Sequence, residues 1–431
     1  MKLNLCQSSS ESLKKNPCRS FTKITKMEDK PLLIDKTVKK IEFLFRYTGI
    51  NIKAGPKTRM DAIKSRIVYI INFIWLYMDL GGAVVFFFNG IANSKSFTEL
   101  TYGAPCITLS FLSSFKTLYL IFREDNVDKL MQVQRDLELN ERRRPKHVEK
   151  DAIINSEHNF VTTVISVLNI FYFVLIVAFA LSPSILVAFK YYTTNELELT
   201  LPFRIVYPFD AYDIRYWPWV YLHQIWSDVV VVIGICPVDY MFYIFCTYTR
   251  MQFRLLKHYI ERLIDSETRL SNVEQVRAEF VLLIKWHQDL IRSVSMLETI
   301  YTRSTLFNFM ASSLLICLTG FNVTAISDVV VVGTFLSFLF MSLFQIFFLC
   351  FFGDLLMTSS MEVSDAVYNC RWYLADAHFG KDLLLVQTRA QTPCKLTACN
   401  FADVNLKAFM KILSTSWSYF ALLNTLYGSP T

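Results

Sequence analysis

A line of polar side chains runs along one face of the final apolar segment, Asp403 to Tyr427. On a helix, steps of three and four residues bring together Lys411, Ser414, Thr415, Ser418, Leu422 and Leu426. Hydroxyls in lipid can hydrogen-bond to a neighbouring helix, and the pattern alone favours this packing interpretation. They can also wet the wall of a pore that the two leucines close by expelling water. Both interpretations stay open at this point.

Four ionisable residues lie inside other apolar segments: Asp79, Lys116, Asp228 and Asp239. Charges in lipid are costly, so such residues usually face protein or water and mark structural pairs or transport paths. Lys116 lies close to the cytoplasmic end of its segment, where we expect its long side chain to reach the interface. We favour structural pairing over ion-coupled transport, in which Asp228 or Asp239 would bind the transported ion.

The sequence lacks the residue patterns of catalysis and metal binding. It contains no H-E-x-x-H, no G-x-S-x-G and no G-x-x-x-x-G-K-[ST] pattern. The six histidines are scattered, and the ten cysteines form no C-x-x-C pair. We therefore expect no enzyme, no metal site and no cofactor, and we assign His287 a structural hydrogen bond.

Seven segments are long and apolar enough to cross a hydrocarbon core of about 30 Å. They are Ile67–Ile91, Leu100–Phe122, Phe160–Phe189, Trp217–Phe245, Ser304–Ile326, Val329–Phe352 and Val404–Tyr427. An α-helix satisfies its own backbone groups in lipid, so each segment is expected to be helical. The sequence therefore predicts an all-α membrane protein with seven transmembrane helices.

Lys and Arg are distributed very unequally between the two sides of the membrane. Most fall in the N-terminal tail and in residues 123–159, 246–303 and 353–403, whereas the other side holds only Lys95, Lys190, Arg204 and Arg215. The positive-inside rule therefore predicts a cytoplasmic N-terminus and an extracellular C-terminus. Topology thus accounts for the net charge of +7 without a nucleic-acid partner. This orientation is the reverse of that of a G-protein-coupled receptor.

The chain divides into four predicted parts. Residues 1–66 form a cytoplasmic N-terminal segment, with disorder up to about residue 35 and a short interfacial helix at Ile41–Ile50. Residues 67–352 hold transmembrane helices one to six with their loops, 353–403 form a cytoplasmic region, and 404–431 form the last helix and the extracellular C-terminus. Residues 246–303 have a helical period and extend spans four and five into the cytoplasm. With Ser359–Leu385 they are expected to build an anchor domain that holds subunits together.

The outer loop at 190–216 is rich in aromatic residues and proline. It contains Leu201-Pro202-Phe203 and Tyr207-Pro208-Phe209-Asp210, in which proline and aspartate break helix. Such a loop can fold over the mouth of the bundle as a lid. Its Tyr and Trp can equally form an aromatic belt at the membrane interface. The sequence weighs these interpretations evenly.

An ordered set of motifs lies near the end of the chain. Ser364, Ala366, Tyr368 and Trp372 form S-x-A-x-Y-x-x-x-W, followed by Gln391-Thr392-Pro393 and Ser418-Tyr419-Phe420. This set resembles the C-terminal signature of insect odorant receptors, and the outer loop and the reversed topology are similar to that family as well. The 246–303 loop is shorter than that of the family's shared co-receptor, which favours an odorant-tuned subunit.

The resemblance implies a ligand-gated non-selective cation channel that binds a small volatile odorant or pheromone. It implies a heteromeric tetramer with the insect odorant receptor co-receptor, in the plasma membrane of an olfactory sensory neuron dendrite, in contact with membrane lipids. It places the gate on Ser418, Leu422 and Leu426. It places the ligand in the outer half of the bundle, where the candidates are Ile107, Phe111, Phe173, Ile176, Ala180, Trp226, Val229, Phe335 and Phe338. An insect gustatory-type receptor is the main alternative, and a secondary transporter is less favoured.

Overall fold

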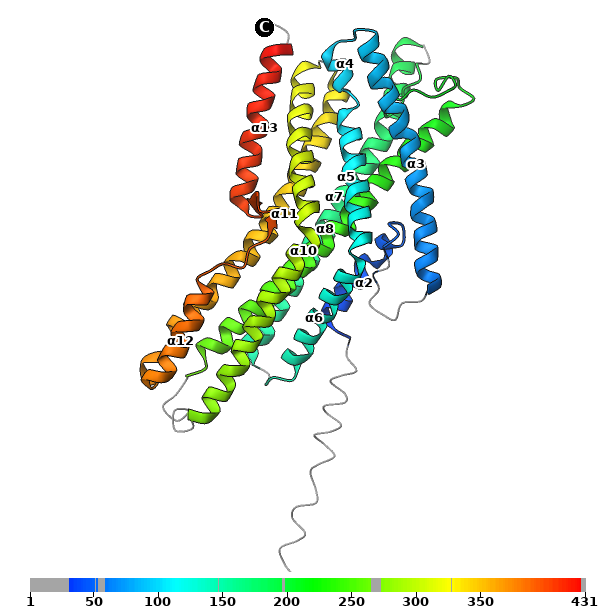
Figure 1. Cartoon of the computed structure of the whole chain (residues 1–431). Coiled ribbons are helices and arrows are strands. Elements are labelled where there is room, and N and C mark those ends of the chain that lie inside the picture. Colours follow the sequence, from blue (N-terminus) through cyan, green and yellow to red (C-terminus); the bar gives the residue numbers. More distant parts are fainter. Residues whose placement is uncertain are drawn as a thin grey trace, which may run out of the picture.

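The fold was analysed in a computed structural model, which describes residues 31–50, 52, 59–145, 147–195, 198–264, 273–326 and 328–427. Almost all of these residues are helical, and the helices form one elongated bundle (Figure 1). The predicted disorder falls largely on residues 1–30, and the predicted extracellular end includes Thr431. Both lie outside the described residues.

The helices and strands have the following bounds. They are α2 (Leu33–Phe45), α3 (Arg59–Ala92), α4 (Phe97–Thr101), α5 (Ala104–Phe122), α6 (Glu124–Arg142), α7 (Val148–Thr194), α8 (Trp217–Glu261), α10 (Val273–Ala325), α11 (Val329–Asn369), the 3-10 helix η1 (Trp372–Leu374), α12 (Ala377–Ala390), β1 (Thr397–Ala398), β2 (Ala402–Asp403) and α13 (Leu406–Tyr427). The two strands pair antiparallel, with Thr397 opposite Asp403 and Ala398 opposite Ala402.

Within the described ranges, six helical segments are long and apolar enough to cross a membrane. They lie in α3, in α4 with α5, and in α7, α8, α10 and α11, so the first six predicted spans are helical. The seventh forms α13, a helix of 22 residues that is not among the six by composition. Its hydroxyls and the lysines Lys407 and Lys411 make it more polar than the others.

The upper part of the bundle exposes a surface suited to lipid. On α3 the side chains of Ile67, Ile70, Ile74 and Met78 are each more than half exposed and recur at helical spacing. A continuous apolar surface of this kind is not stable in water and is normally covered by lipid or protein. With the six apolar segments, this identifies a multi-pass membrane protein.

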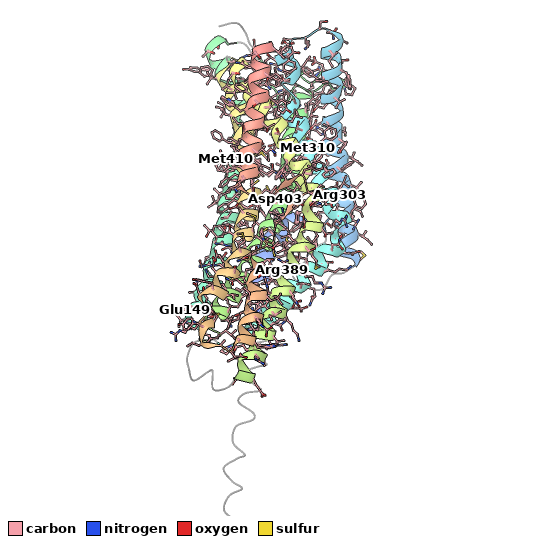
Figure 2. The ribbon with its side chains drawn as sticks, turned by 60° about the vertical axis from the view of Figure 1, so that its left-hand side comes forward. Glu149, Arg303, Met310, Arg389, Asp403 and Met410 are labelled. Atoms are coloured by element: carbon pink, nitrogen blue, oxygen red, sulfur yellow. The ribbon has the colours of Figure 1, made fainter. Side chains whose placement is uncertain are left out.

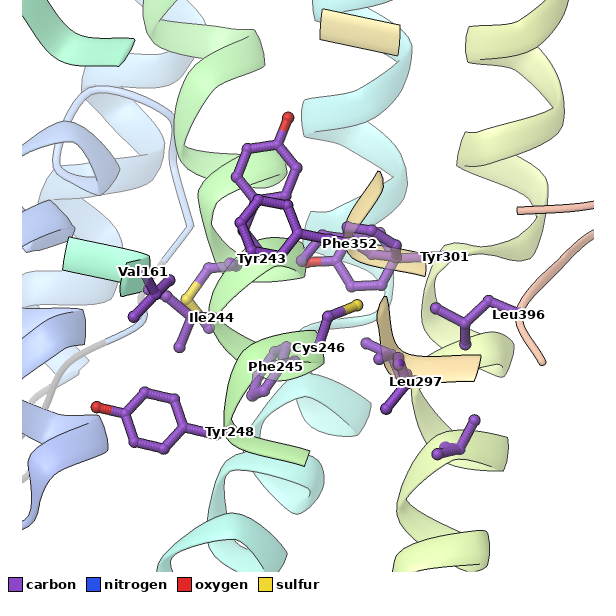
Figure 3. Packing of buried hydrophobic residues seen from close by; sticks show 14 of the residues in the cluster. Val161, Tyr243, Ile244, Phe245, Cys246, Tyr248, Leu297, Tyr301, Phe352 and Leu396 are labelled. Carbon is purple, nitrogen blue, oxygen red and sulfur yellow. The ribbon is translucent and has the colours of Figure 1, made fainter. Parts of the chain in front are cut away.

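Helix α8 lies at the centre of the bundle. Every residue from Gly234 to Thr249 is buried, because this stretch is apolar on all sides and can pack against neighbours all round. Figure 3 shows Tyr243 stacked on Phe352 of α11, with ring centroids 4.6 Å apart. Tyr301 of α10 donates its hydroxyl hydrogen to the carbonyl oxygen of Val238 at 3.2 Å. Three long helices thus share one core.

Helices α5 and α8 approach so closely that their backbones interact. A side chain at Gly234 would bring its Cβ within 2.1 Å of the Ser113 hydroxyl oxygen. Ser113 donates a hydrogen bond to the carbonyl oxygen of Val231 at 3.0 Å, and Thr117 donates to that of Gly234 at 3.1 Å. Small residues at a membrane helix interface allow this close contact.

One buried ion pair links three helices in the same region. The Lys116 ammonium on α5 lies 2.7 Å from a carboxylate oxygen of Asp239 on α8, and Gln345 on α11 donates to the other oxygen at 3.0 Å. The expectation that Lys116 reaches the interface is wrong, since its side chain is 2% exposed. The carboxylate of Asp239 attracts it inward. Structural pairing is therefore confirmed for Lys116 and Asp239.

The first helix also differs from its prediction. Instead of an interfacial helix at Ile41–Ile50, α2 covers Leu33–Phe45 and buries Ile34, Val38 and Ile41 completely. These residues are spaced three and four apart and pack against α8. The Glu138 carboxylate on α6 accepts hydrogen bonds from the first backbone N–H groups of α2, at 2.7 Å from Leu33. Tertiary packing therefore draws this helix into the bundle.

The lower part of the bundle consists of the extensions of α8, α10 and α11 together with α6 and α12 (Figure 1). Extension of spans four and five beyond the apolar segments agrees with the prediction. From α12 the chain turns back, and Figure 2 shows it passing Arg389 and Asp403 before Met410 on α13. The crossing is tight at Gly353 of α11, where a Cβ would lie 2.3 Å from the Val404 carbonyl oxygen.

Removing one partner of the buried ion pair should destabilise the chain. Lys116→Met leaves the Asp239 carboxylate without its cation and should cost about 3–5 kcal/mol, since an uncompensated buried charge is left behind. Thermal unfolding in detergent measures the loss. The double variant Lys116→Met, Asp239→Leu should recover much of it, and Lys190→Met, which breaks an exposed pair with Glu198, should have little effect. A destabilisation no larger than that of Lys190→Met would contradict this role of the pair.

Candidate functional site

A cavity lies in the bundle between α3, the α4–α5 turn, α5, α8, α11 and the outer loop. Its walls are formed by Leu76, Asp79, Leu80, Ala83, Tyr102, Gly103, Cys106, Ile107, Leu109, Ser110, Pro202, Phe203, Arg204, Ile205, Ser227, Asp228, Val231, Thr334, Phe335 and Phe338. Most of these side chains are apolar, and only a few carry polar groups. This composition is typical of a site for a small, mostly apolar molecule.

Backbone and side-chain hydrogen bonds hold the outer loop on this cavity. Gln224 of α8 accepts from the backbone N–H of Phe203 at 2.9 Å and donates to its carbonyl oxygen at 3.2 Å. The backbone N–H of Val206 donates to the carbonyl oxygen of Gly82 on α3 at 3.3 Å. Residues 202–205 therefore form part of the cavity wall, as the lid interpretation requires.

Other aromatic residues of the loop fit the alternative interpretation. Tyr192, Tyr212 and Tyr216 are largely exposed, and so is Trp219 at the start of α8. Side chains with an apolar body and a polar tip are favoured at the membrane interface. The two interpretations thus apply to different residues of one loop.

Asp79 of α3 is held by two groups at the edge of the cavity. The Tyr207 hydroxyl donates to its Oδ1 at 2.7 Å, and the Nδ1 of His223 lies 2.9 Å from the same oxygen. Burial raises the pKa of the Tyr207 phenol, and the Asp79 carboxylate adds to this shift. The phenol therefore keeps its proton and acts as a donor. This contact fastens the loop to α3 a second time.

Two further charged residues line the cavity. Arg204 in the loop stacks its guanidinium on the Tyr102 ring, 4.6 Å from the centroid. Asp228 on α8 is the second, and in the described part of the chain its side chain has no hydrogen bond and no ion pair. The cavity thus offers free carboxylate oxygen within apolar walls.

Three of the nine predicted ligand contacts line this cavity: Ile107, Phe335 and Phe338. The other six do not. Phe111 and Phe173 are 45% and 67% exposed on the outside of the bundle, Ile176 packs beside the core, and the Ala180 carbonyl accepts a hydrogen bond from Tyr221. Trp226 donates its indole N–H to Asn72 at 3.3 Å, and Val229 is half-buried elsewhere on α8. A role of any of the nine in binding ligand stays a prediction.

The reason for these placements is the rotational phase of each helix. On α8 the cavity wall is formed by Ser227, Asp228 and Val231, which share one face, while Trp226 and Val229 point elsewhere. In a helix that is apolar on all sides, hydrophobicity does not mark the inward face. A useful signal was present in the acids: Asp79 and Asp228 both lie in apolar segments, and both line the cavity.

Helix α13 packs on the bundle by one face only. Ser416 donates to the Ser313 hydroxyl of α10 at 3.1 Å, and Phe420 lies against Gly320. At the outer end the Tyr427 ring stacks on Phe97 of α4, with centroids 4.3 Å apart. Packing therefore uses Ser416, a hydroxyl that lies outside the predicted stripe.

The predicted gate residues lie on the opposite face of α13. Leu422 and Leu426 are 53% and 63% exposed, and Ser418 is exposed and donates to the Ser414 carbonyl oxygen at 3.0 Å. Lys411, Ser414 and Thr415 are exposed on this side as well. Hydroxyls without a helical neighbour do not serve packing within one chain. This face is thus available to water or to another subunit.

Comparison with known proteins identifies the family. The family model described as "7tm Odorant receptor" matches residues 96–417. Odorant receptor 67c of Drosophila melanogaster is 27% identical over 432 residues, which cover 97% of this chain and 100% of that protein. Odorant receptor 85c of the same fly is 23% identical and covers 89% of this chain and 98% of the relative. The chain belongs to the insect odorant receptor family.

A solved structure has the same fold. The insect olfactory receptor OR5 from Machilis hrabei, in complex with eugenol, superposes with a TM-score of 0.74 and 17% identity. The alignment covers 91% of this chain and 98% of OR5. The family is a receptor family with a non-enzymatic fold, which confirms that the chain is not an enzyme. The chain is a multi-pass membrane odorant receptor.

A side chain at the loop contact should loosen the cavity wall. In Gly82→Ala, the new Cβ would lie 2.3 Å from Ile205 and 2.6 Å from the Val206 carbonyl oxygen, so the loop must move away from α3. Such overpacking costs about 1–3 kcal/mol. Faster proteolysis of residues 200–216 and a lower unfolding temperature measure the effect. Gly81→Ala, whose Cβ meets nothing within 4 Å, is the matched control, and equal behaviour of the two variants would refute the contact.

Proposed function

We propose that this chain is the odorant-tuned subunit of a ligand-gated, non-selective cation channel assembled with the insect odorant receptor co-receptor. The observation that carries the proposal is the exposed face of α13, where polar residues lead to Leu422 and Leu426. In this assignment the N-terminus is cytoplasmic, the C-terminus is extracellular, and the chain resides in the plasma membrane of olfactory neuron dendrites.

The chemistry of α13 supports a pore wall. Hydroxyl groups are poorly solvated by lipid tails, so an exposed row of them is stabilised by water or by another protein chain. When several subunits turn this face to one axis, the hydroxyls contact a water column and the leucines narrow it. A narrow apolar ring expels water and blocks ions until it widens. We assign Leu422 and Leu426 to this gate and Ser418 to the wetted wall.

The cavity and α13 share structural neighbours through which ligand binding can act. Phe335 and Phe338 of α11 line the cavity, and further along the same helix Phe347 contacts Phe409 of α13 with centroids 5.6 Å apart. Helix α4 leads directly into the cavity wall at Tyr102 and stacks on Tyr427. A ligand gates the pore if it binds the open arrangement of these helices more tightly than the closed one.

The lower end of the bundle offers a surface for subunit contact. The end of α11, η1 and α12 surround a groove that includes Tyr368, Trp372 and Tyr373. All three aromatic side chains are about half exposed or more. Exposed aromatic groups of this kind are enriched in protein interfaces. We assign this region to the cytoplasmic anchor between subunits.

Currents in transfected cells test the proposal. Volatile compounds should evoke a cation current only when this chain is expressed with the co-receptor, and Leu422→Ala should raise the current at rest, because a smaller side chain widens the apolar ring. Ile74→Ala, on the lipid-facing side of α3, should leave it unchanged. Silence to a broad volatile panel together with normal surface expression would argue against a channel subunit.

A further inference from the structure

Within the described residues, the side chain of Asp228 in the cavity wall has no polar partner. It lines the cavity beside apolar groups such as Cys106 and Val231, and it forms no hydrogen bond and no ion pair there. Asp228 is half-buried, and a carboxyl group partly withdrawn from water without a partner is costly, more so when it is charged. Ionisable residues in membrane helices are accordingly rare and mark functional sites by default.

A second acidic residue on the same helix, Asp239, has a structural role and provides a comparison. Asp239, three turns further along α8, has both oxygens engaged, one by Lys116 and one by Gln345. Asp228 has neither kind of partner among the described residues. The difference indicates that the partner of Asp228 comes from outside the chain.

A second unpaired acceptor belongs to another residue of the cavity wall, Asp79. Oδ1 of Asp79 is engaged by Tyr207 and His223, but its buried Oδ2 has no hydrogen-bond partner in the described part of the molecule. Asp79 is 5% exposed, so bulk water is largely excluded from it. The cavity wall therefore contains two carboxyl groups with spare oxygen atoms, one on α3 and one on α8, and the spare Asp79 oxygen is covered by protein.

The cation that lines the cavity is occupied elsewhere. Arg204 lies over the Tyr102 ring, and within the described ranges it forms no ion pair with Asp228 or Asp79. Its side chain belongs to an exposed residue of the outer loop, where water can solvate it. Among the described residues, Asp228 thus has no Lys or Arg side chain within ion-pair distance, whereas Asp79 has His223 beside it.

We propose that the cavity selects small, mostly apolar molecules that carry a hydrogen-bond donor, either a hydroxyl or an amine. In this proposal the Asp228 side chain accepts the hydrogen bond from that donor. The inference rests on the proposed function, whose ligand site it specifies. Leu76, Leu80, Ile107 and Phe335 surround the carbon skeleton, and Asp79 provides a second acceptor. A molecule with only an acceptor, such as a ketone, has no hydrogen to donate to a carboxylate oxygen of either acid. A polar site of this kind discriminates strongly against analogues that lack the matching group.

Three compounds with one carbon skeleton test the inference: heptan-2-ol, heptan-2-amine and heptan-2-one. Concentration–response curves are recorded from cells that express the full chain with the co-receptor. We expect the alcohol or the amine to act at a concentration at least about tenfold lower than the ketone, because a buried acceptor left unpaired weakens binding by that order. The alcohol and the amine also distinguish a neutral donor from a cationic one.

Asp228→Leu removes the acceptor without reducing the apolar volume and should abolish the preference for donors, with the ketone gaining. Asp228→Asn, which keeps one oxygen, should retain the alcohol response and weaken the amine response. Glu198→Gln changes an exposed acid outside the cavity and should leave the preference unchanged. Equal potency of the three compounds, or a donor preference that survives Asp228→Leu, would overturn the inference.

A direct binding measurement separates this inference from the channel proposal. The purified full-length chain is heated in detergent with each compound, and ligand binding raises its unfolding temperature whether or not a pore opens. A larger rise with the alcohol or amine than with the ketone, lost in Asp228→Leu, supports the inference even if no current is seen. No rise with any of the three overturns it, whereas currents without a donor preference leave only the channel proposal standing.

Discussion

The structure depends on one requirement: polar groups placed in lipid must find partners inside the protein. Helix α8 meets this requirement for the whole bundle. Its Asp239 carboxylate holds Lys116 of α5 and Gln345 of α11 at hydrogen-bonding distance, and its backbone carbonyls accept from Ser113 and Tyr301. In a low-dielectric interior each contact is strong when made and costly when broken. These contacts specify which faces of α5, α10 and α11 meet α8, a choice that similar apolar faces alone would not make.

The same requirement distinguishes two parts of α8, one around Asp239 and one around Asp228. Both carboxylate oxygens of Asp239 find partners within the chain, Lys116 and Gln345. About 16 Å further out, at the helical rise of 1.5 Å per residue, α8 presents Asp228 to a cavity instead of a partner. The outer loop, fastened to Gly82, Asp79 and Gln224, separates this cavity from the outside. A site that leaves polar groups unpaired gives up stability and gains selectivity.

Helix α13 stands apart because it packs by one face and leaves the other uncovered. Its contacts with α10 and α4 involve Ser416, Phe420 and Tyr427, whereas Leu422 and Leu426 are 53% and 63% exposed. Below it, the close crossing at Gly353 ties the start of the helix to α11, the helix that also lines the cavity. One-sided packing leaves this face of α13 to lipid, water or further chains, and the proposed channel assembly supplies water and further chains. Helix α11 thus connects the cavity to α13, which carries the proposed gate.

The sequence by itself determined the helical segments, the membrane character, the extension of α8 and α10 and, through the motif from Ser364 to Trp372, the family. These properties depend on local composition and spacing, which a single helix already expresses. Only the tertiary structure decided the partner of Lys116, the docking of α2 and the inward residues of α8. The physical reason is that, in a helix that is apolar on all sides, the hydrophobic pattern does not indicate which face packs against protein. That choice is made by contacts such as Ser113 with Val231 and Glu138 with α2, which join residues about a hundred positions apart.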